Sequence, residues 1–274
     1  MRMGTGFRLL KRSRDHGGIN AIVIGPTGSG KTTFLLSKLA SSLLERREYL
    51  FWRGLEFCQW TYLPPHSVKL LLDPTQEYDF IDRKKKRTIP LDKLGEYGLK
   101  WSYCYEIEDF YVKAELGKLN VVYTTNDNFR EFCRFLTLRP DIEWISVFMD
   151  EIEKFAPANV EGDLWRKNLE FANTLAEFRK NFISFYCAAQ DYGDIDYRVT
   201  NKMNYRVYLK GARVPRTKTI VYPKLTLKLY KNQAIIDGGI FAQTTFDKLK
   251  HHLYLVVKIK PKELTVISNT PSPL

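Results

Sequence analysis

Apolar residues along the chain fall into two patterns, short unbroken runs and helical spacings, and the two alternate through most of its length. The runs predict strands at residues 20–24, 68–72, 119–123, 144–149, 182–188 and 205–209. The spacings predict helices at residues 31–46, 128–138 and 164–180. Strands that alternate with helices favour an α/β fold, with a mostly parallel sheet and helices on both of its faces.

Two regions depart from this alternation. Residues 79–117 are charged and aromatic without a clear period, which indicates an insertion. Residues 219–236 and 252–259 alternate in the way of a β-ribbon. We therefore expect a basic N-terminal arm at 1–19, a core at 20–236 with an insertion around 79–117, and a C-terminal extension at 237–274. The length of 274 residues fits one large α/β domain of this kind.

Composition narrows the cellular context. No stretch approaches the roughly 20 apolar residues that span a bilayer, so no transmembrane segment is expected. The basic start of the chain has no apolar segment typical of a secretory signal. The cysteines are scattered without a C-x-x-C pair, at Cys58, Cys104, Cys133 and Cys187. We therefore expect reduced thiols, no zinc site and a cytoplasmic location, which is the host cytoplasm if the chain is viral.

The net charge of +12 is concentrated rather than spread. Residues 197–236 contain ten Lys or Arg and no Asp or Glu. Such a stretch suits a polyanionic partner, and nucleic acid is the expected one, with Arg213, Arg216 and Lys218 as candidate DNA contacts. The alternative is a solvated basic surface that keeps the chain in solution.

One motif carries specific chemistry. Residues 25–32, Gly-Pro-Thr-Gly-Ser-Gly-Lys-Thr, match G-x-x-x-x-G-K-[ST] between a predicted strand and a predicted helix. Its glycines let backbone N–H groups point at phosphates, and the helix adds its positive end. We expect Lys31 to reach the β- and γ-phosphates of ATP and Thr32 to bind Mg²⁺. The predicted nucleotide-binding residues are Gly25, Pro26, Thr27, Gly28, Ser29, Gly30, Lys31, Thr32 and Thr33.

An acidic pair follows the predicted strand at 144–149. Asp150 is expected to hold the Mg²⁺ shell, and Glu151 to act as the general base that polarises the attacking water. A small-molecule kinase needs no such glutamate, because its acceptor brings the nucleophile. The alternative is an acidic N-cap for the segment that follows.

Two further residues stand near the predicted strand at 182–188. Gln190 ends it, and on a strand between those of the P-loop and the acidic pair it would sit at the γ-phosphate and orient water. Arg179 precedes it, and arginine is the usual cation for neutralising charge in phosphoryl transfer. The alternatives are a surface glutamine and a cation at a helix C-terminus.

Four stretches together resemble the HerA/FtsK superfamily of DNA-pumping ATPases. They are Gly25–Thr32; Leu70-Leu71-Leu72-Asp73-Pro74-x-x-Glu77-Tyr78; Phe148-Met149-Asp150-Glu151-x-x-x-Phe155-x-Pro157; and Arg179-Lys180 followed by Ala189-Gln190. The resemblance implies a RecA-like (ASCE) P-loop core that binds ATP and Mg²⁺. It also implies that Arg179 acts in trans across a hexamer interface, with Lys31, Glu151 and Gln190 catalytic in each subunit.

The resemblance favours an ATP-driven double-stranded DNA translocase that assembles into a hexameric ring. The chain's size is similar to that of short viral packaging ATPases, which predicts packaging of a genome into a preformed capsid, with a capsid or membrane docking protein as a further partner. A plasmid or conjugative DNA pump and a Zot-like phage-assembly ATPase are alternatives. A P-loop nucleotide kinase and a nucleotide-gated scaffold are rivals from other classes, which turnover with and without duplex DNA separates.

Overall fold

The computed structural model describes part of the chain, and the described residues form two sheets and the helices between their strands. They are residues 17–32, 34–35, 38–39, 42, 47–54, 60–63, 68–72, 78–82, 87–89, 114–117, 119–139, 143–215, 223–230, 233–238 and 254–258. The candidate residues Thr33, Asp73, Pro74, Glu77, Arg216 and Lys218 lie outside these ranges. So do Cys58 and Cys104.

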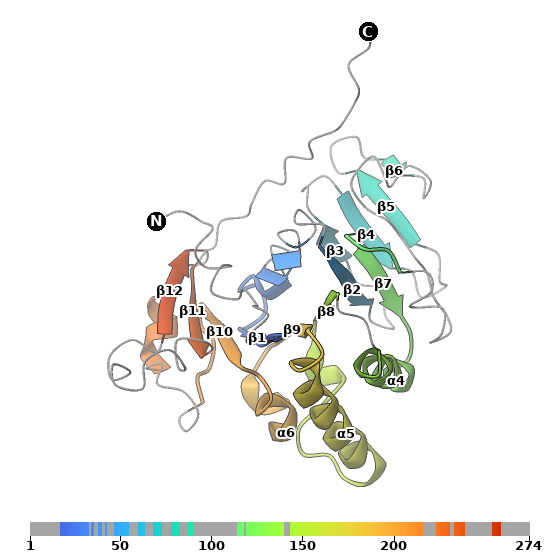
Figure 1. Ribbon diagram of the computed structural model, residues 1–274. Coiled ribbons are helices and arrows are strands. Elements are labelled where there is room, and N and C mark those ends of the chain that lie inside the picture. The colour runs from blue at the N-terminus through green and yellow to red at the C-terminus, as the bar shows by residue number, and fades with distance from the viewer. Residues whose placement is uncertain are drawn as a thin grey trace.

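The larger sheet has eight strands in the order β12-β11-β10-β1-β9-β8-β2-β7 (Figure 1). They are β1 (Asn20–Ile24), β2 (Glu48–Gly54), β7 (Leu119–Tyr123), β8 (Trp144–Met149), β9 (Ile183–Ala189), β10 (Tyr205–Leu209), β11 (Gln233–Gly238) and β12 (Tyr254–Lys258). The strands from β10 to β7 pair in parallel, whereas β11 and β12 add antiparallel. The expected mostly parallel α/β sheet is therefore confirmed.

Helices cover both faces of this sheet. α4 (Asn126–Thr137), α5 (Gly162–Phe178) and α6 (Tyr197–Thr200) connect β7, β8, β9 and β10 in turn. These connections all step in one direction across the sheet, so right-handed crossovers place the three helices on one face, where α5 packs against both others (Figure 1). The helix within residues 31–42 connects β1 to β2 in the opposite direction and covers the other face.

Alternate side chains of β9 show how the two faces are filled. Phe185 points to the α5 face, where its ring centroid lies 5.7 Å from that of Phe171 in an edge-on contact. The next residue, Tyr186, stacks on Phe148 at 4.9 Å, and the ammonium of Lys38 lies 5.3 Å from the Tyr186 ring centroid. Successive strand residues point to opposite faces, so β9 has apolar contacts on both sides and is a central strand.

The strand β2 was not predicted from the sequence, although it fills the position between β7 and β8. Charged residues near both of its ends interrupt the apolar run that would predict a strand. Glu48 is buried and accepts a hydrogen bond from the hydroxyl of Ser146. Arg53 is buried and donates to the side-chain oxygen of Asn126 at 2.6 Å. Because partners from other elements satisfy these charges, the strand tolerates them in the core.

The strand predicted at residues 68–72 forms, but not in the parallel sheet. It belongs to a second sheet of four antiparallel strands, in the order β3-β4-β5-β6. These are β3 (Trp60–Leu63), β4 (Val68–Leu72), β5 (Tyr78–Asp82) and β6 (Arg87–Ile89). The placement of residues 68–72 in the core was thus wrong, and this sheet begins before the insertion expected around 79–117. An apolar run predicts a strand but not its partners, because pairing is non-local.

The expected ribbon at 219–236 and 252–259 is only partly strand. Residues Pro223–Lys228 form the 3₁₀ helix η4, and β11 begins at Gln233. Proline lacks the N–H that a strand ladder requires, which disfavours a strand here. η4 is held to the turn after β10, since the backbone N–H of Gly211 donates to the Thr226 carbonyl at 3.1 Å.

Candidate ATP-binding and hydrolysis site

The loop after β1 has the backbone of a phosphate cradle. Gly28 and Gly30 have φ angles of +78° and +100°, which disfavour any side chain. A Cβ built on either glycine meets no heavy atom of the described chain within 4 Å, so the space above the loop is open. The N–H of Phe34 donates to the Gly30 carbonyl at 2.9 Å, which starts the helix directly after the loop. These features fit a bound triphosphate.

Lys31 and Ser29 are the polar side chains of the loop with the most informative surroundings. The ammonium of Lys31 donates to the carbonyl oxygens of Gly25 at 2.8 Å and Pro26 at 3.4 Å, which holds it over the loop. The hydroxyl of Ser29 is buried and has no hydrogen-bond partner among the described residues. This hydroxyl lies against Gly25, where an added Cβ would collide with it, so the first glycine of the loop leaves room for Ser29.

Thr32 and Asp150 meet although they lie far apart in the sequence. Thr32 is in the first turn of the helix after the P-loop, and Asp150 directly follows β8. The Thr32 hydroxyl donates to Oδ2 of Asp150 at 2.6 Å. Burial raises the pKa of Asp150, and the hydrogen bonds from Thr32 and the Glu151 N–H oppose that rise. A hydroxyl and a carboxylate together fit the oxygen ligands that Mg²⁺ requires.

Glu151 has an unusual backbone. Its φ of 51° and ψ of 51° are left-handed, and it begins the 3₁₀ turn η2 (Ile152–Lys154). Its side chain makes no capping hydrogen bond to η2, so it does not act as the acidic N-cap that the sequence left as an alternative. Its Oε2 instead forms an ion pair of 2.6 Å with the ammonium of Lys154. Left-handed non-glycine residues cluster at functional sites, where the strain is retained for geometry.

Gln190 directly follows β9, and β9 lies between β1 and β8 as expected. The N–H of Gly25 donates to the Ala189 carbonyl at 3.3 Å, so Gln190 begins beside the P-loop. Ligands of open α/β sheets bind at the carboxyl ends of the strands, where the chain connections change direction. The change occurs here, because β1 leads toward β2 whereas β9 leads toward β10 on its other side.

Glu153 is a site residue that sequence reasoning missed. It lies in η2, and its Oε1 accepts a hydrogen bond of 3.2 Å from the backbone N–H of Gln190. Burial raises the pKa of its carboxyl. Its spacing from Asp150 gives no recognisable signal, because acidic residues are common in surface turns.

Arg179 is not brought to its own P-loop. It is the C-terminal cap of α5, and its carbonyl accepts from the N–H of Gly18 at 2.9 Å, ahead of the start of β1. The P-loop follows the other end of β1, and five strand residues span about 17 Å. Arg179 therefore lies at the amino-terminal ends of the central strands, whereas the P-loop lies at their carboxyl ends.

The structure divides the basic stretch at 197–236 into two groups. Lys210, Arg213, Lys224 and Lys228 are exposed, and the Arg213 side chain is 88% exposed. Arg198 and Arg206 are largely covered, with side chains 10% and 16% exposed. Arg198 is paired with Asp196, and Arg206 donates to the hydroxyl of Tyr192 at 3.3 Å. The exposed group surrounds the turn after β10, where Gly211 packs against Pro26 of the P-loop.

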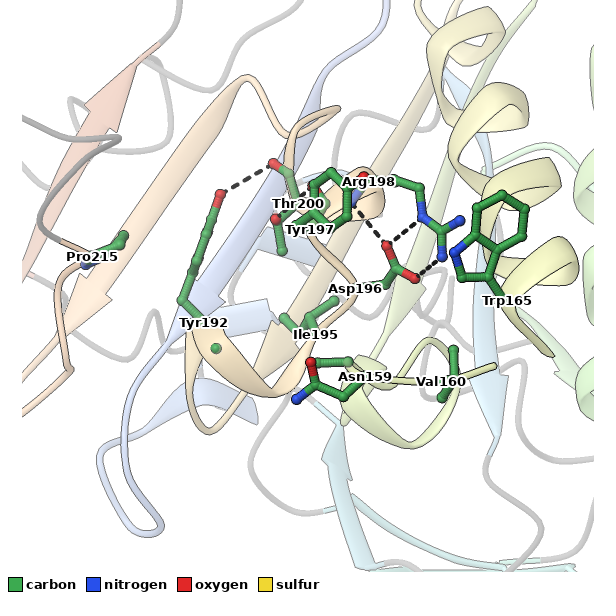
Figure 2. Close-up of a pocket in the computed structure, with 12 residues that line it drawn as sticks. Asn159, Val160, Trp165, Tyr192, Ile195, Asp196, Tyr197, Arg198, Thr200 and Pro215 are labelled. Atoms are coloured by element: carbon green, nitrogen blue, oxygen red, sulfur yellow. Dashed lines mark hydrogen bonds and ion pairs between the residues drawn. The ribbon is translucent and has the colours of Figure 1, made fainter. Parts of the chain in front are cut away.

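A cavity of about 430 Å³ is lined by the segments that follow Glu151 and Gln190 (Figure 2). In its wall the Arg198 guanidinium packs over the Trp165 ring, 4.2 Å from the centroid, and is held by Asp196. The lining segments also bond to each other, since the N–H of Ala158 donates to the Asp194 carbonyl at 2.9 Å. The segment after Glu151 is thereby tied to the segment after Gln190.

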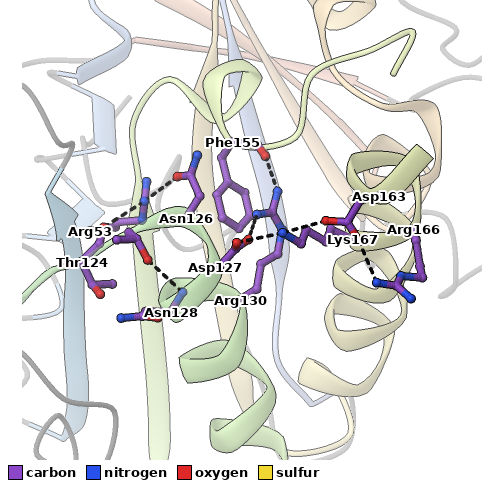
Figure 3. Close-up of polar contacts among 11 residues, drawn as sticks. Arg53, Thr124, Asn126, Asp127, Asn128, Arg130, Phe155, Asp163, Arg166 and Lys167 are labelled. Atoms are coloured by element: carbon purple, nitrogen blue, oxygen red, sulfur yellow. Dashed lines mark hydrogen bonds and ion pairs between the residues drawn. The ribbon is translucent and has the colours of Figure 1, made fainter. Parts of the chain in front are cut away.

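A second set of contacts holds the segment after Glu151 to α4 (Figure 3). Arg130 donates to the Phe155 carbonyl at 2.7 Å, and its guanidinium lies 4.3 Å from the Phe155 ring centroid. Asp127 accepts from Arg130 and also from Lys167 of α5 at 2.8 Å. Hydrogen bonding to Lys167 is the main cause that lowers the pKa of Asp127. The segment after Glu151 is thus tied to α4, which is in turn tied to α5.

The chain was compared with protein families, curated proteins and solved structures. No protein-family model matches the chain, and neither does any curated protein. Solved structures do match: the genome packaging NTPase B204 of Sulfolobus turreted icosahedral virus 2, in complex with ATP-gammaS, has a TM-score of 0.55 at 11% identity, covering 88% of this chain and 98% of that one. B204, the DNA-packaging ATPase of Sulfolobus Turreted Icosahedral Virus, has a TM-score of 0.51 at 12% identity, covering 88% and 98%. The fold is that of a P-loop ATPase.

This likeness extends over the whole core and not only over the P-loop.

Among the residues that the structure describes, no helix has both the length and the apolar character needed to cross a bilayer. The described cysteines, Cys133 and Cys187, are buried free thiols, and burial raises the pKa of both. Cys187 lies in β9, and the charges of Glu153 and Asp150 add to the rise of its pKa.

Proposed function

We propose that the chain is an ATP-driven translocase of double-stranded DNA that packages a viral genome into a preformed capsid. The observation that carries this proposal is one edge of the parallel sheet, where Thr32 and Asp150 meet beside Glu151 and Gln190, in a fold shared with genome packaging NTPases. Similar structures were solved with ATP-gammaS and with AMPPCP, which supports ATP as the nucleotide.

Each site residue has a defined task in hydrolysis. Backbone N–H groups of the P-loop bind the phosphates, and Lys31 neutralises the β- and γ-phosphate charge. Thr32 and Asp150 hold Mg²⁺, which supplies further charge neutralisation when it is bound. Glu151 accepts the proton of the attacking water, after its carboxylate leaves the ion pair with Lys154. Gln190 orients that water.

The exposed basic group provides the DNA contacts. Lys210, Arg213, Lys224 and Lys228 surround the turn that packs on the P-loop, so a DNA phosphate bound there is mechanically close to the nucleotide. Arg216 and Lys218 belong to the same stretch of sequence. Phosphate contacts carry little base information, which suits a motor that moves any sequence.

The decisive experiment measures ATP turnover with and without duplex DNA, with Lys31→Ala as the background. A translocase is stimulated by long duplex DNA. Phosphate transfer to a nucleotide acceptor without DNA would identify a kinase, and binding with no DNA response would identify a scaffold. Displacement of a third strand from a DNA triplex then tests movement, and turnover without displacement contradicts translocation.

The DNA surface has its own test. Contacts to phosphates release counterions, so log affinity should fall with log salt by about 0.9 per phosphate contacted. Neutralising Lys210 and Arg213 together should reduce that slope, whereas Arg166→Gln, on the exposed side of α5, should leave it unchanged. Equal slopes for both variants would place the DNA elsewhere.

A further inference from the structure

The carboxylate of Glu153 joins two parts of the site that come from different strands. Its position in η2 follows β8 and Glu151, and its Oε1 accepts from the Gln190 N–H, at the end of β9, at 3.2 Å. Its Oε2 is buried and has no hydrogen-bond partner in the described part of the chain. One oxygen is therefore used to join the strands, and the other is a spare acceptor within the site.

The Glu153 carboxyl is influenced by burial and by the charges of candidate site residues. Burial raises the pKa of its carboxyl, hydrogen bonds from its own N–H and that of Gln190 oppose this, Glu151 raises it further, and Lys31 lowers it. Glu153 thus lies close enough to the catalytic carboxylate and the P-loop lysine to interact with both. A buried carboxylate with an unpaired oxygen destabilises a fold, so its presence calls for a role other than stability.

Gln190 needs such a partner because it lies just beyond its strand. β9 ends at Ala189, whose carbonyl accepts from Gly25, and the next residue has no ladder position in the sheet. The acceptor for its N–H is supplied by Glu153 instead of by a strand. Without that bond the exposed Gln190 would lose this tie between its backbone and η2. Displacement of a catalytic group by about 1 Å can lower a rate by about 100-fold.

We propose that Glu153 is a positioning residue for hydrolysis, which fixes the backbone of Gln190 so that its side chain faces the γ-phosphate and the attacking water. The Oε2, which has no partner among the described residues, is available to accept a hydrogen bond from the Gln190 side-chain amide when that side chain turns toward the nucleotide, which would leave the amide oxygen to accept from water. Glu153 acts through Gln190 and not on the substrate. This inference rests on the proposed ATP hydrolysis at this site, but not on DNA translocation.

The test compares Glu153→Ala and Glu153→Gln in full-length protein by ATP turnover without DNA. Glu153→Ala removes the acceptor and should lower kcat by about 10- to 100-fold. KM and the affinity for a fluorescent ADP analogue should stay within about twofold, because no phosphate contact is lost. Glu153→Gln keeps an acceptor oxygen for the Gln190 N–H but loses the second acceptor for the side-chain amide, and should recover part of kcat. Glu170→Ala, an exposed glutamate of α5, is the matched control.

A double variant separates this role from a structural one. Because Glu153 acts through Gln190, Glu153→Ala combined with Gln190→Ala should be no slower than Gln190→Ala alone. Multiplied losses, a wild-type kcat for Glu153→Ala, or a fall in kcat matched by loss of folded protein would each overturn the proposal. Wild-type turnover that DNA fails to stimulate would reject the translocase, while the kcat comparison still tests Glu153.

Discussion

The hydroxyl of Thr32 and the carboxylate of Asp150 are 2.6 Å apart, although 118 residues separate them in the sequence. The two residues end up together because β9 alone separates their strands, and both follow a strand at its carboxyl end. The contact assembles two oxygen ligands of the kind that Mg²⁺ prefers. The parallel sheet thus brings together the two candidate metal ligands without a nucleotide.

Replacing Thr32 with valine should remove the metal ligand with little change of shape. We expect ATP turnover to fall by about 100-fold and the Mg²⁺ concentration for half-maximal rate to rise, because one ligand is lost. Thr32→Ser keeps the hydroxyl and should retain most of the activity. The measurement is ATP turnover over a Mg²⁺ titration. Equal titration curves for the valine variant and the wild type would show that Thr32 is not a ligand.

Glu151→Gln should separate binding from hydrolysis. The amide cannot accept the proton of water, so we expect turnover to fall by about 10²–10⁴-fold while ATP binding persists. Lys31→Ala should lose both hydrolysis and tight binding, since its ammonium contacts the phosphates in the ground state as well. Binding of a fluorescent ATP analogue and phosphate release distinguish the two variants. Native turnover by Glu151→Gln would reject it as the base.

The buried pair of Asp196 and Arg198 predicts a defined pH dependence of stability. Burial raises the pKa of Asp196, but hydrogen bonds from Arg198 and Asn168 outweigh it, so the folded pKa lies below the ordinary 3.8. A depressed carboxyl pKa contributes stability above the unfolded value, and this is lost as pH falls through the folded value. Asp196→Asn should therefore lower the free energy of unfolding by about 3 kcal/mol at neutral pH.

Urea unfolding across pH checks this expectation. The difference between wild type and Asp196→Asn should be constant from neutral to mildly acidic pH and should shrink only below the ordinary aspartate pKa of 3.8. Asp163→Asn is the matched control, because its pairs with Arg166 and Lys167 are exposed and contribute little. A difference that shrinks well above that pH would assign the stability to another group.

The sequence predicted those parts of the structure that local pattern decides. β1 and β8 form over the predicted residues because each is an unbroken apolar run. β2 escaped prediction because Glu48 and Arg53 look like surface residues, and their buried partners come from distant segments. The strand at 68–72 was found but assigned to the wrong sheet, since pairing is decided by contacts far along the chain.

The candidate site also contains residues that the local sequence predicts and residues that depend on distant contacts. The P-loop is a contiguous motif whose glycines have the positive φ angles that it requires. Gln190 was expected beside it on the condition that its strand lies between those of the P-loop and the acidic pair, and β9 does lie between β1 and β8. Glu153 gave no signal, as its role depends on a hydrogen bond across 37 residues. The sequence also did not predict that the Arg198 side chain is largely covered. Its partner Asp196 precedes the stretch 197–236, which has basic but no acidic residues.

Arg179 is expected to act on the nucleotide of a neighbouring subunit. Its carbonyl bonds to Gly18 ahead of β1, and the P-loop follows the other end of that strand, so Arg179 can serve as a finger only if assembly brings it to the nucleotide of a neighbour. Arg179→Ala should bind ATP nearly normally yet hydrolyse it about 10³–10⁵-fold more slowly, as for other arginine fingers. Lys180→Ala, the adjacent cation at the same helix end, should remain active.

Mixing two inactive variants tests the trans arrangement directly. In a mixed ring, some interfaces pair the intact Glu151 of an Arg179→Ala subunit with the intact Arg179 of a Glu151→Gln subunit, so activity should partly return. A cation that only stabilises a helix C-terminus predicts a loss of about 0.3–1 kcal/mol in stability and no complementation. If co-assembled variants stay inactive, Arg179 is not the finger. Arg213 is then the next candidate, because Arg198 and Arg206 are turned inward.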